Sequence, residues 1–169
     1  MNLVLCVMIV VVCTAMGRVF AGRMADRLSF FREYQQNFTL LTDSVVGLSL
    51  ELYKALRSCQ GGAFKEMFED CASLLQKRPQ ASFQEIWQIS FARLKQSFGC
   101  LTKDDAKMVL EGGVAIEALC MNPSEKQAGI YLKRLAGFTS ALETEKTKKC
   151  KLYNTTGVLA GLMIALLVI

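Results

Sequence analysis

Apolar residues recur every three or four positions through the middle of the chain, and this spacing places them on one face of a helix. In the first such segment, residues 24–58, the spacing predicts a single long helix. Its apolar face consists of Leu28, Phe31, Phe38, Leu41, Val45, Leu48, Leu52 and Leu56. The sequence shows no sustained alternation of apolar and polar residues, so we expect no strands.

Glycine, proline and capping residues mark where the next helices begin and end. Gly61-Gly62 favours a turn after the first helix, and residues 63–77 form a second amphipathic helix. Pro79 disfavours helix at the residue before it, so the second helix ends there. Ser82 followed by Glu85 is a capping box, which predicts the start of a third helix.

Two further helices follow from the same kind of signal. Thr102 and Asp105 form a second capping box, which opens a fourth helix that runs to about Leu119. Asn122-Pro123 provides an N-cap and a proline at the first position of a fifth helix. No proline follows, so we expect this helix to continue toward the end of the chain. Five amphipathic helices must bury their apolar faces together, and the predicted fold is an all-α antiparallel helical bundle over residues 24–150.

The two ends of the chain are apolar, and all 35 charged side chains lie between Arg18 and Lys151. The uncharged runs have 17 residues at the start and 18 at the end. At 1.5 Å per residue each run reaches about 25–27 Å, close to the shortest helix that crosses a bilayer. We therefore predict transmembrane helices over residues 1–21 and 152–169, flanking the bundle. The alternatives are a cleaved secretory signal at the start and a buried core helix at the end.

Basic residues gather beside both apolar ends. Loops rich in lysine and arginine stay on the cytoplasmic side, so we expect a cytoplasmic bundle with both termini outside. Basic residues at this level also attract anionic membrane lipid. The predicted membrane-edge basic residues are Arg18, Arg23, Arg27, Lys146, Lys148, Lys149 and Lys151.

The charge pattern argues against nucleic-acid binding and gives no support to catalysis. The net charge is +5, but residues 33–145 carry 12 basic and 14 acidic side chains, so the bundle has no basic excess to hold phosphates. The chain has no histidine and no phosphate-cradling motif, so we expect no enzymatic activity, cofactor or metal. The seven cysteines include no CxxC pair, and we interpret them as small core residues.

Small residues form two further patterns. Gly157, Gly161 and Ala165 recur every four residues along the C-terminal run, a spacing that lets another helix pack closely in a membrane. The partner helix is the N-terminal span, a second copy of the chain or a different protein. Gly112-Gly113 inside the fourth helix predicts a close helix–helix approach. The spacing in residues 24–58 also fits a coiled coil between two chains, so a homo-oligomer stays open.

With these features in order, the chain resembles the stage III sporulation protein AB family over nearly its whole length. The strongest likeness is the ending, Lys151-Leu152-Tyr153 followed by GVLAGL at 157–162. Gln127 also fits the family pattern. Similar segments are GLSLELYKAL at 47–56, SFQEIW at 82–87 and LTKDDAKMVLEGG at 101–113.

The resemblance implies a function that the residue pattern alone does not. The family is similar to the cytoplasmic helical domain of type II secretion F proteins, which are platform subunits that dock a secretion ATPase. It therefore implies a non-enzymatic membrane scaffold in a sporulation-specific, secretion-like channel complex between mother cell and forespore. The implied partners are a cytoplasmic ATPase and sibling membrane channel subunits. The alternative is a membrane-anchored regulator that binds a soluble cytoplasmic factor without a channel role. Both are expectations by analogy of fold.

Overall fold

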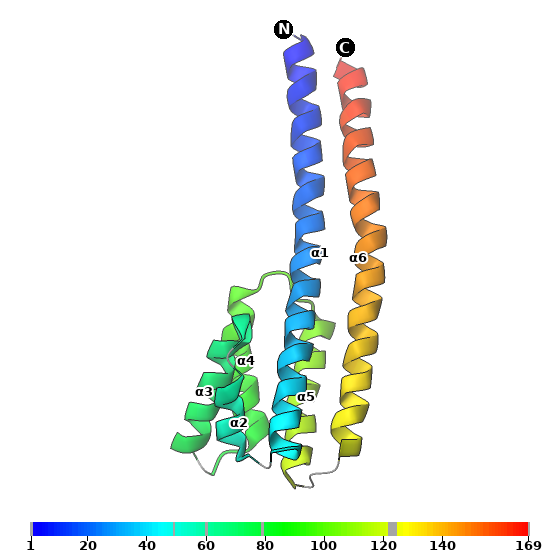
Figure 1. The fold of residues 1–169 in the computed structure, drawn as a ribbon. Coiled ribbons are helices and arrows are strands. Elements are labelled where there is room, and N and C mark those ends of the chain that lie inside the picture. Colours follow the sequence, from blue (N-terminus) through cyan, green and yellow to red (C-terminus); the bar gives the residue numbers. More distant parts are fainter. Residues whose placement is uncertain (1, 49, 60, 79, 122–124, 169) are drawn as a thin grey trace. The chain divides into compact units, whose positions relative to one another are not determined.

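The computed structural model is built from helices throughout the part of the chain that it describes (Figure 1). Backbone is described for residues 2–168 except 49, 60, 79 and 122–124, and side chains are not described at 2–7, 9, 125–127, 154, 157, 158, 161, 162 and 165–168. The predicted all-α class is therefore confirmed, with no strand among the described residues. In order the elements are α1 (Asn2–Val46), α2 (Leu52–Ser58), the 3-10 helix η1 (Gly62–Phe64), α3 (Lys65–Lys77), α4 (Phe83–Ser97), α5 (Lys103–Met121) and α6 (Glu125–Val168).

The chain divides into two compact units, which we describe separately. The terminal unit consists of Met1–Ser29 and Ser140–Ile169, and the central unit is Phe30–Thr139. Helices α1 and α6 contribute residues to both units, whereas α2 to α5 belong to the central unit alone.

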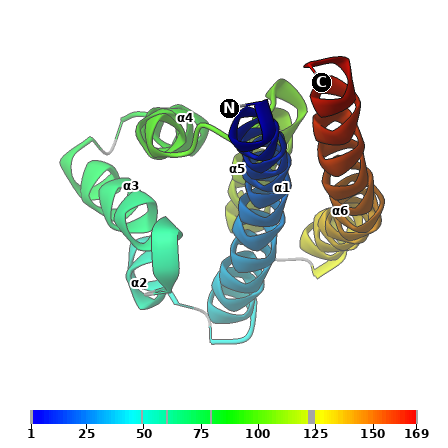
Figure 2. The same ribbon diagram turned by 90° about the horizontal axis from the view of Figure 1, so that it is seen from above.

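Aromatic side chains form the core of the central unit. The fully buried ones come from α1, η1, α3 and α4, and they are Phe31, Tyr34, Phe38, Phe64, Phe68 and Trp87. Within this unit α2 packs on α3, α3 on α4 and α4 on α5 (Figure 2). The rings of Phe31 and Phe138 lie 4.9 Å apart and those of Phe38 and Tyr131 4.7 Å apart, so α1 and α6 pack as antiparallel neighbours.

The expected second to fifth helices are present, and the Asn122-Pro123 cap predicted for the fifth lies outside the described residues. Helix α3 ends at Lys77, and Ser82 caps α4 by accepting a hydrogen bond from the Glu85 N–H at 3.2 Å. The second capping box is reciprocal, because the Thr102 N–H donates to Asp105 Oδ2 at 2.8 Å and the Asp105 N–H donates to Thr102 Oγ1 at 3.3 Å. Helix α6 continues to Val168, as expected from the absence of a later proline.

The prediction of one helix over residues 24–58 is wrong. Helix α1 starts at Asn2 and ends at Val46, and a separate helix α2 begins at Leu52. The Asp43 carbonyl accepts hydrogen bonds from the N–H groups of Gly47 and Leu48, which closes α1. Spacing by three and four continues across this break, but Leu48 is 69% exposed there. Helix α2 instead turns to pack on α3, an arrangement that periodicity within one segment does not report.

Gly112 and Gly113 allow a close approach, but the groups that approach them are aromatic side chains. A Cβ on Gly112 would lie 2.0 Å from the Tyr34 hydroxyl, and one on Gly113 would lie 2.5 Å from the Trp87 ring. The indole N–H of Trp87 donates to the Val109 carbonyl at 2.9 Å, and the Tyr131 hydroxyl donates to the Met108 carbonyl at 2.8 Å. The two glycines therefore let three aromatic rings reach the backbone of α5.

Among the described residues, no helix includes a stretch that is both long enough and apolar enough to cross a membrane. Much of the two predicted spans, 1–21 and 152–169, has side chains outside the described residues. The predicted ridge of Gly157, Gly161 and Ala165 is helical in its backbone, but its surroundings lie outside the described residues as well.

Candidate functional site

In the terminal unit, aromatic and charged side chains of α1 and α6 form a cluster of contacts. The rings of Phe20 and Tyr153 lie 5.9 Å apart, and the Arg23 guanidinium lies 5.9 Å from the centre of the Phe20 ring. Nearer the central-unit ends of the two segments, Arg27 pairs with Glu145 at 3.7 Å. We call these five residues and Lys149 the belt. The paired sequence numbers run in opposite directions, so the segments are antiparallel within this unit.

Glu145 joins the two helices within the belt. Its carboxylate pairs with Arg27 from α1 and also with Lys149, one turn further along α6, at 2.5 Å. The Arg27 side chain is largely covered, whereas those of Glu145 and Lys149 are about 40% exposed. A partly covered pair that joins two helices is screened less by salt than an exposed one.

The terminal unit carries a positive excess around the belt. It holds seven basic and three acidic residues, a net charge of +4, out of +5 for the whole chain. Aromatic and basic side chains next to an apolar segment are typical of the part of a protein that lies at a membrane–water interface. The arrangement suits an anionic surface.

Beyond the belt, both helices expose large apolar side chains. Soluble proteins rarely leave contiguous apolar patches of this kind in water. The exposed large apolar residues of the terminal unit are Met8, Val11, Val12, Met16, Val19, Phe20, Leu152, Leu159, Met163 and Ile164. By contrast, the buried apolar side chains described in this unit are Leu28 and Leu142.

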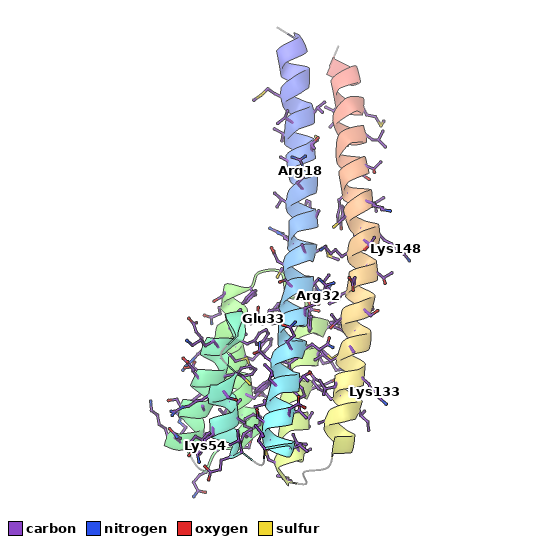
Figure 3. The ribbon with its side chains drawn as sticks, in the orientation of Figure 1. Arg18, Arg32, Glu33, Lys54, Lys133 and Lys148 are labelled. Carbon is purple, nitrogen blue, oxygen red and sulfur yellow. The ribbon has the colours of Figure 1, made fainter. Side chains whose placement is uncertain are left out.

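The predicted membrane-edge residues all lie in the terminal unit, but they have different surroundings. Arg18 and Lys148 are exposed and are labelled on α1 and α6 in Figure 3. Arg23 stacks on Phe20, and Arg27 is the most covered of the arginines named here. Lys146 and Lys149 are half-buried, whereas Lys151 is exposed.

Three belt residues escaped the sequence prediction. Phe20 and Tyr153 carry a signal that could have revealed them, since each is an aromatic residue within a few positions of the basic residues beside an apolar end. Glu145 carries no such signal, because its role depends on Arg27, which is 118 positions earlier in the sequence. Its contact exists only once the two segments are paired.

The central unit has a second exposed feature, an apolar tip. Leu48 follows α1, Met121 ends α5 and Ile130 lies in the second turn of α6, and they are 69%, 80% and 67% exposed. These positions lie toward the same end of the unit, because α1 and α6 are antiparallel and α5 leads into α6. A groove of about 570 Å³ runs along α1 in this unit, and Arg32, Gln35, Gln36, Thr39 and Leu40 line it.

The buried polar groups of the central unit have structural roles. The hydroxyls of Tyr34 and Tyr131 lie 3.1 Å apart, and burial raises the pKa of both phenols, so they remain neutral. Burial also raises the pKa of Cys59 to about 11 and that of Cys71 to about 12, which disfavours reactive thiolates. The interpretation of cysteines as core residues holds for these two, whereas Cys120 is exposed. The described residues contain no group of metal-ligating side chains.

Comparison with known families identifies this architecture. The family model described as stage III sporulation protein AB matches residues 2–169, essentially the whole chain, so the chain belongs to this family. Comparison with curated proteins and with solved structures gave no significant match.

Proposed function

We propose that this member of the stage III sporulation protein AB family is a non-enzymatic membrane scaffold of a sporulation-specific, secretion-like channel complex. In this proposal residues 1–21 and 152–169 are retained membrane helices. The central unit lies in the cytoplasm, on the mother-cell side, where it docks a cytoplasmic ATPase. Family membership supports the sporulation role. The other parts rest on the surfaces of the two units and on the resemblance to secretion platform subunits.

The exposed apolar surface of the terminal unit is the observation that carries the proposal. Among the described residues, nine large apolar side chains besides Phe20 of the belt are exposed on two paired helices. In water such a surface is unfavourable by about 25 cal/mol per Å² of apolar area, whereas in lipid it is stabilised. The belt then lies at the headgroups, where basic residues each gain about 1 kcal/mol from anionic lipid.

Extraction and labelling test the membrane arrangement. Alkaline carbonate should leave the full chain in the membrane pellet, and release into the supernatant would contradict the retained spans. Cys120 is exposed in the central unit and suits topology labelling better than the buried Cys71. A membrane-impermeant maleimide should label Cys120 only after cells are opened, with Cys120→Ser as the control. Labelling of this residue in intact cells would place the central unit outside.

The apolar tip is the surface that we assign to protein docking. Leu48, Met121 and Ile130 are each more than 60% exposed on a unit whose other large apolar residues are mostly buried. Exposed apolar residues gathered at one end of such a unit are typical of protein–protein interfaces. The same unit also has the groove along α1, whose lining includes the polar side chains of Gln35, Gln36 and Thr39.

Co-purification from sporulating cells tests the scaffold role. The tagged wild type should bring down a secretion-like ATPase together with sibling membrane subunits. Met121→Glu should reduce recovery of the ATPase at least about tenfold, the effect of losing roughly 1.4 kcal/mol at an interface hot spot. Val114→Glu is the matched control, because Val114 is exposed on the same helix away from the tip. Recovery of a soluble factor with no channel subunit would favour the alternative, a membrane-anchored regulator.

A further inference from the structure

We infer that the terminal unit holds an anionic phospholipid in a groove on α1 that ends at Arg18. The inference deepens the proposed function and rests on its membrane helices, since the lipid is taken from the surrounding bilayer. It concerns a defined site that one lipid occupies, with its acyl chain along the groove and its phosphate on the arginine, rather than general attraction to the belt.

The groove follows one stripe of α1. It has a volume of about 390 Å³ and is lined by Val10, Val11, Thr14, Ala15 and Arg18. These positions are separated by three and four residues, so they form adjacent rows on a single helix face. From the first to the last of them, eight residues at 1.5 Å give a length of about 12 Å.

The described residues along the groove before Arg18 offer no unpaired polar group, although one of them is a threonine. Thr14 has a hydroxyl, but it donates to the Val10 carbonyl at 2.8 Å and so is already satisfied inside the helix. The other described residues along the groove before Arg18 are Val10, Val11 and Ala15, which are apolar. A hydrocarbon chain can therefore lie along the groove without leaving a polar group unpaired.

Arg18 supplies the charge at one end of the groove. Its side chain is exposed, and it makes no ion pair with any residue that the structure describes. Arg23 and Arg27 differ, because the first lies over the Phe20 ring and the second pairs with Glu145. A guanidinium binds a phosphate through two parallel hydrogen bonds, which makes Arg18 the group in this unit best placed to hold a headgroup.

The dimensions match one leaflet of a bilayer. The hydrocarbon core of a membrane is about 30 Å thick, so one leaflet contributes about 15 Å. A groove of about 12 Å with an arginine at its end spans most of that depth and puts the charge at the headgroup level. The net charge of +4 on the unit favours an anionic lipid over a zwitterionic one.

Native mass spectrometry of the full chain released from detergent micelles tests the site. We expect the wild type to retain phosphatidylglycerol roughly five- to tenfold better than phosphatidylcholine. Both lipids offer a phosphate to Arg18, but the positive choline of phosphatidylcholine offsets the phosphate charge and is repelled by the arginine. Arg18→Gln should abolish this preference. Arg23→Gln is the matched control and should keep it, because Arg23 lies outside the groove. Ala15→Phe should fill the groove and reduce retention of both lipids, with unchanged helix content by circular dichroism.

Three results would overturn the inference. Equal losses in Arg18→Gln and Arg23→Gln would show that lipid responds to the charge of the belt and not to a site. A dimer that Ala15→Phe dissociates, with lipid retention unchanged, would show that a second copy fills the groove. A wild type that resists carbonate but binds both lipids equally would contradict the lipid site and leave the scaffold proposal standing, whereas carbonate extraction of the wild type would remove the scaffold proposal itself.

Discussion

Among the described residues, most large apolar side chains of the terminal unit are exposed and most of those in the central unit are buried, although helices α1 and α6 contribute residues to both. Met16 is 57% exposed and Met67 only 2% exposed. In the central unit η1, the end of α4 and the backbone of α5 contact side chains of α1 and α6. In the terminal unit each helix has one described neighbour, the other helix, and most of its surface has no protein cover.

This difference shows that helix formation and burial are separate consequences of sequence. Both units are helical because their residues favour helix and make local hydrogen bonds. A helix that is apolar all round needs an apolar environment on all sides, whereas one with a polar face needs cover on one side only. The uncharged runs 1–17 and 152–169 are of the first kind and the central helices of the second, which is why our proposal places lipid around the former and water around the latter.

Substitution of matched methionines gives the largest expected contrast between the units. Met67→Ala removes a buried side chain from α3 and should lower the free energy of unfolding of the central unit by about 2–5 kcal/mol. Met16→Ala removes a similar side chain from an exposed position and should change it by less than about 0.5 kcal/mol. Urea unfolding of the full chain in mild detergent, followed by Trp87 fluorescence, measures both. Equal effects would contradict the contrast in burial.

Substitution of two glycines by alanine, one in the core and one on the surface, tests how tightly the central core is packed. Gly112→Ala places a Cβ 2.0 Å from the Tyr34 hydroxyl and 2.8 Å from that of Tyr131, so it should destabilise the unit by about 1–3 kcal/mol. Gly137→Ala on α6 meets no atom within 4 Å and should be neutral or stabilising by up to about 1 kcal/mol. The midpoint of urea unfolding distinguishes the two, and a stable Gly112→Ala variant would show that the rings can move away.

Alkaline pH should destabilise the central unit. Burial raises the pKa of Cys71 from its ordinary value near 9 to about 12 and that of Cys59 to about 11, so both thiols stay protonated in the folded state at pH values where the unfolded chain loses the protons. The stabilisation is fully present below pH 9 and is lost as pH rises toward 11–12, by roughly 1.4 kcal/mol per pH unit for each thiol. Unfolding midpoints at pH 8, 9.5 and 10.5 should fall, and Cys71→Ala should flatten the slope. A slope unchanged in that variant would assign the effect to Cys59 or the buried tyrosines instead.

The N-cap of α4 gives the smallest of these expected effects on the central unit. Ser82→Ala removes the acceptor for the Glu85 N–H and should cost about 1 kcal/mol. Ser97→Ala, at an exposed position at the other end of the same helix, is the control and should be nearly neutral. Thermal unfolding by circular dichroism compares the pair, and no difference between them would mean that water replaces the cap.

Features set by neighbouring residues could be predicted from the sequence, and features set by distant residues could not. The caps at Ser82 and Thr102 involve residues three positions apart, so their motifs are visible in the sequence. The end of α1 at Val46 was missed because it accompanies the packing of α2 on α3, which lies beyond the segment itself. Likewise Tyr34 and Tyr131 are 97 positions apart, and nothing near either one predicts their contact.

The candidate site also has features that could be predicted from the sequence and features that could not. The membrane-edge arginines and lysines could be named from their positions beside uncharged runs, since charge and hydropathy are properties of single residues. Their different surroundings could not, because the Phe20 ring decides the position of Arg23 and Glu145 that of Arg27. The groove that ends at Arg18 could not be predicted either, because a groove is a property of the folded helix surface and not of its composition.

By itself, the sequence determined the helical class, the positions of most caps and the separation of apolar ends from a charged middle, because each depends on interactions within one or two turns of helix. The tertiary structure alone decided which helices are neighbours, where α1 gives way to α2, how three aromatic rings reach two glycines, and which basic residues of the terminal unit contact Phe20 and Glu145. Those outcomes depend on packing between segments that are distant in the chain, where shape and not local preference sets the free energy.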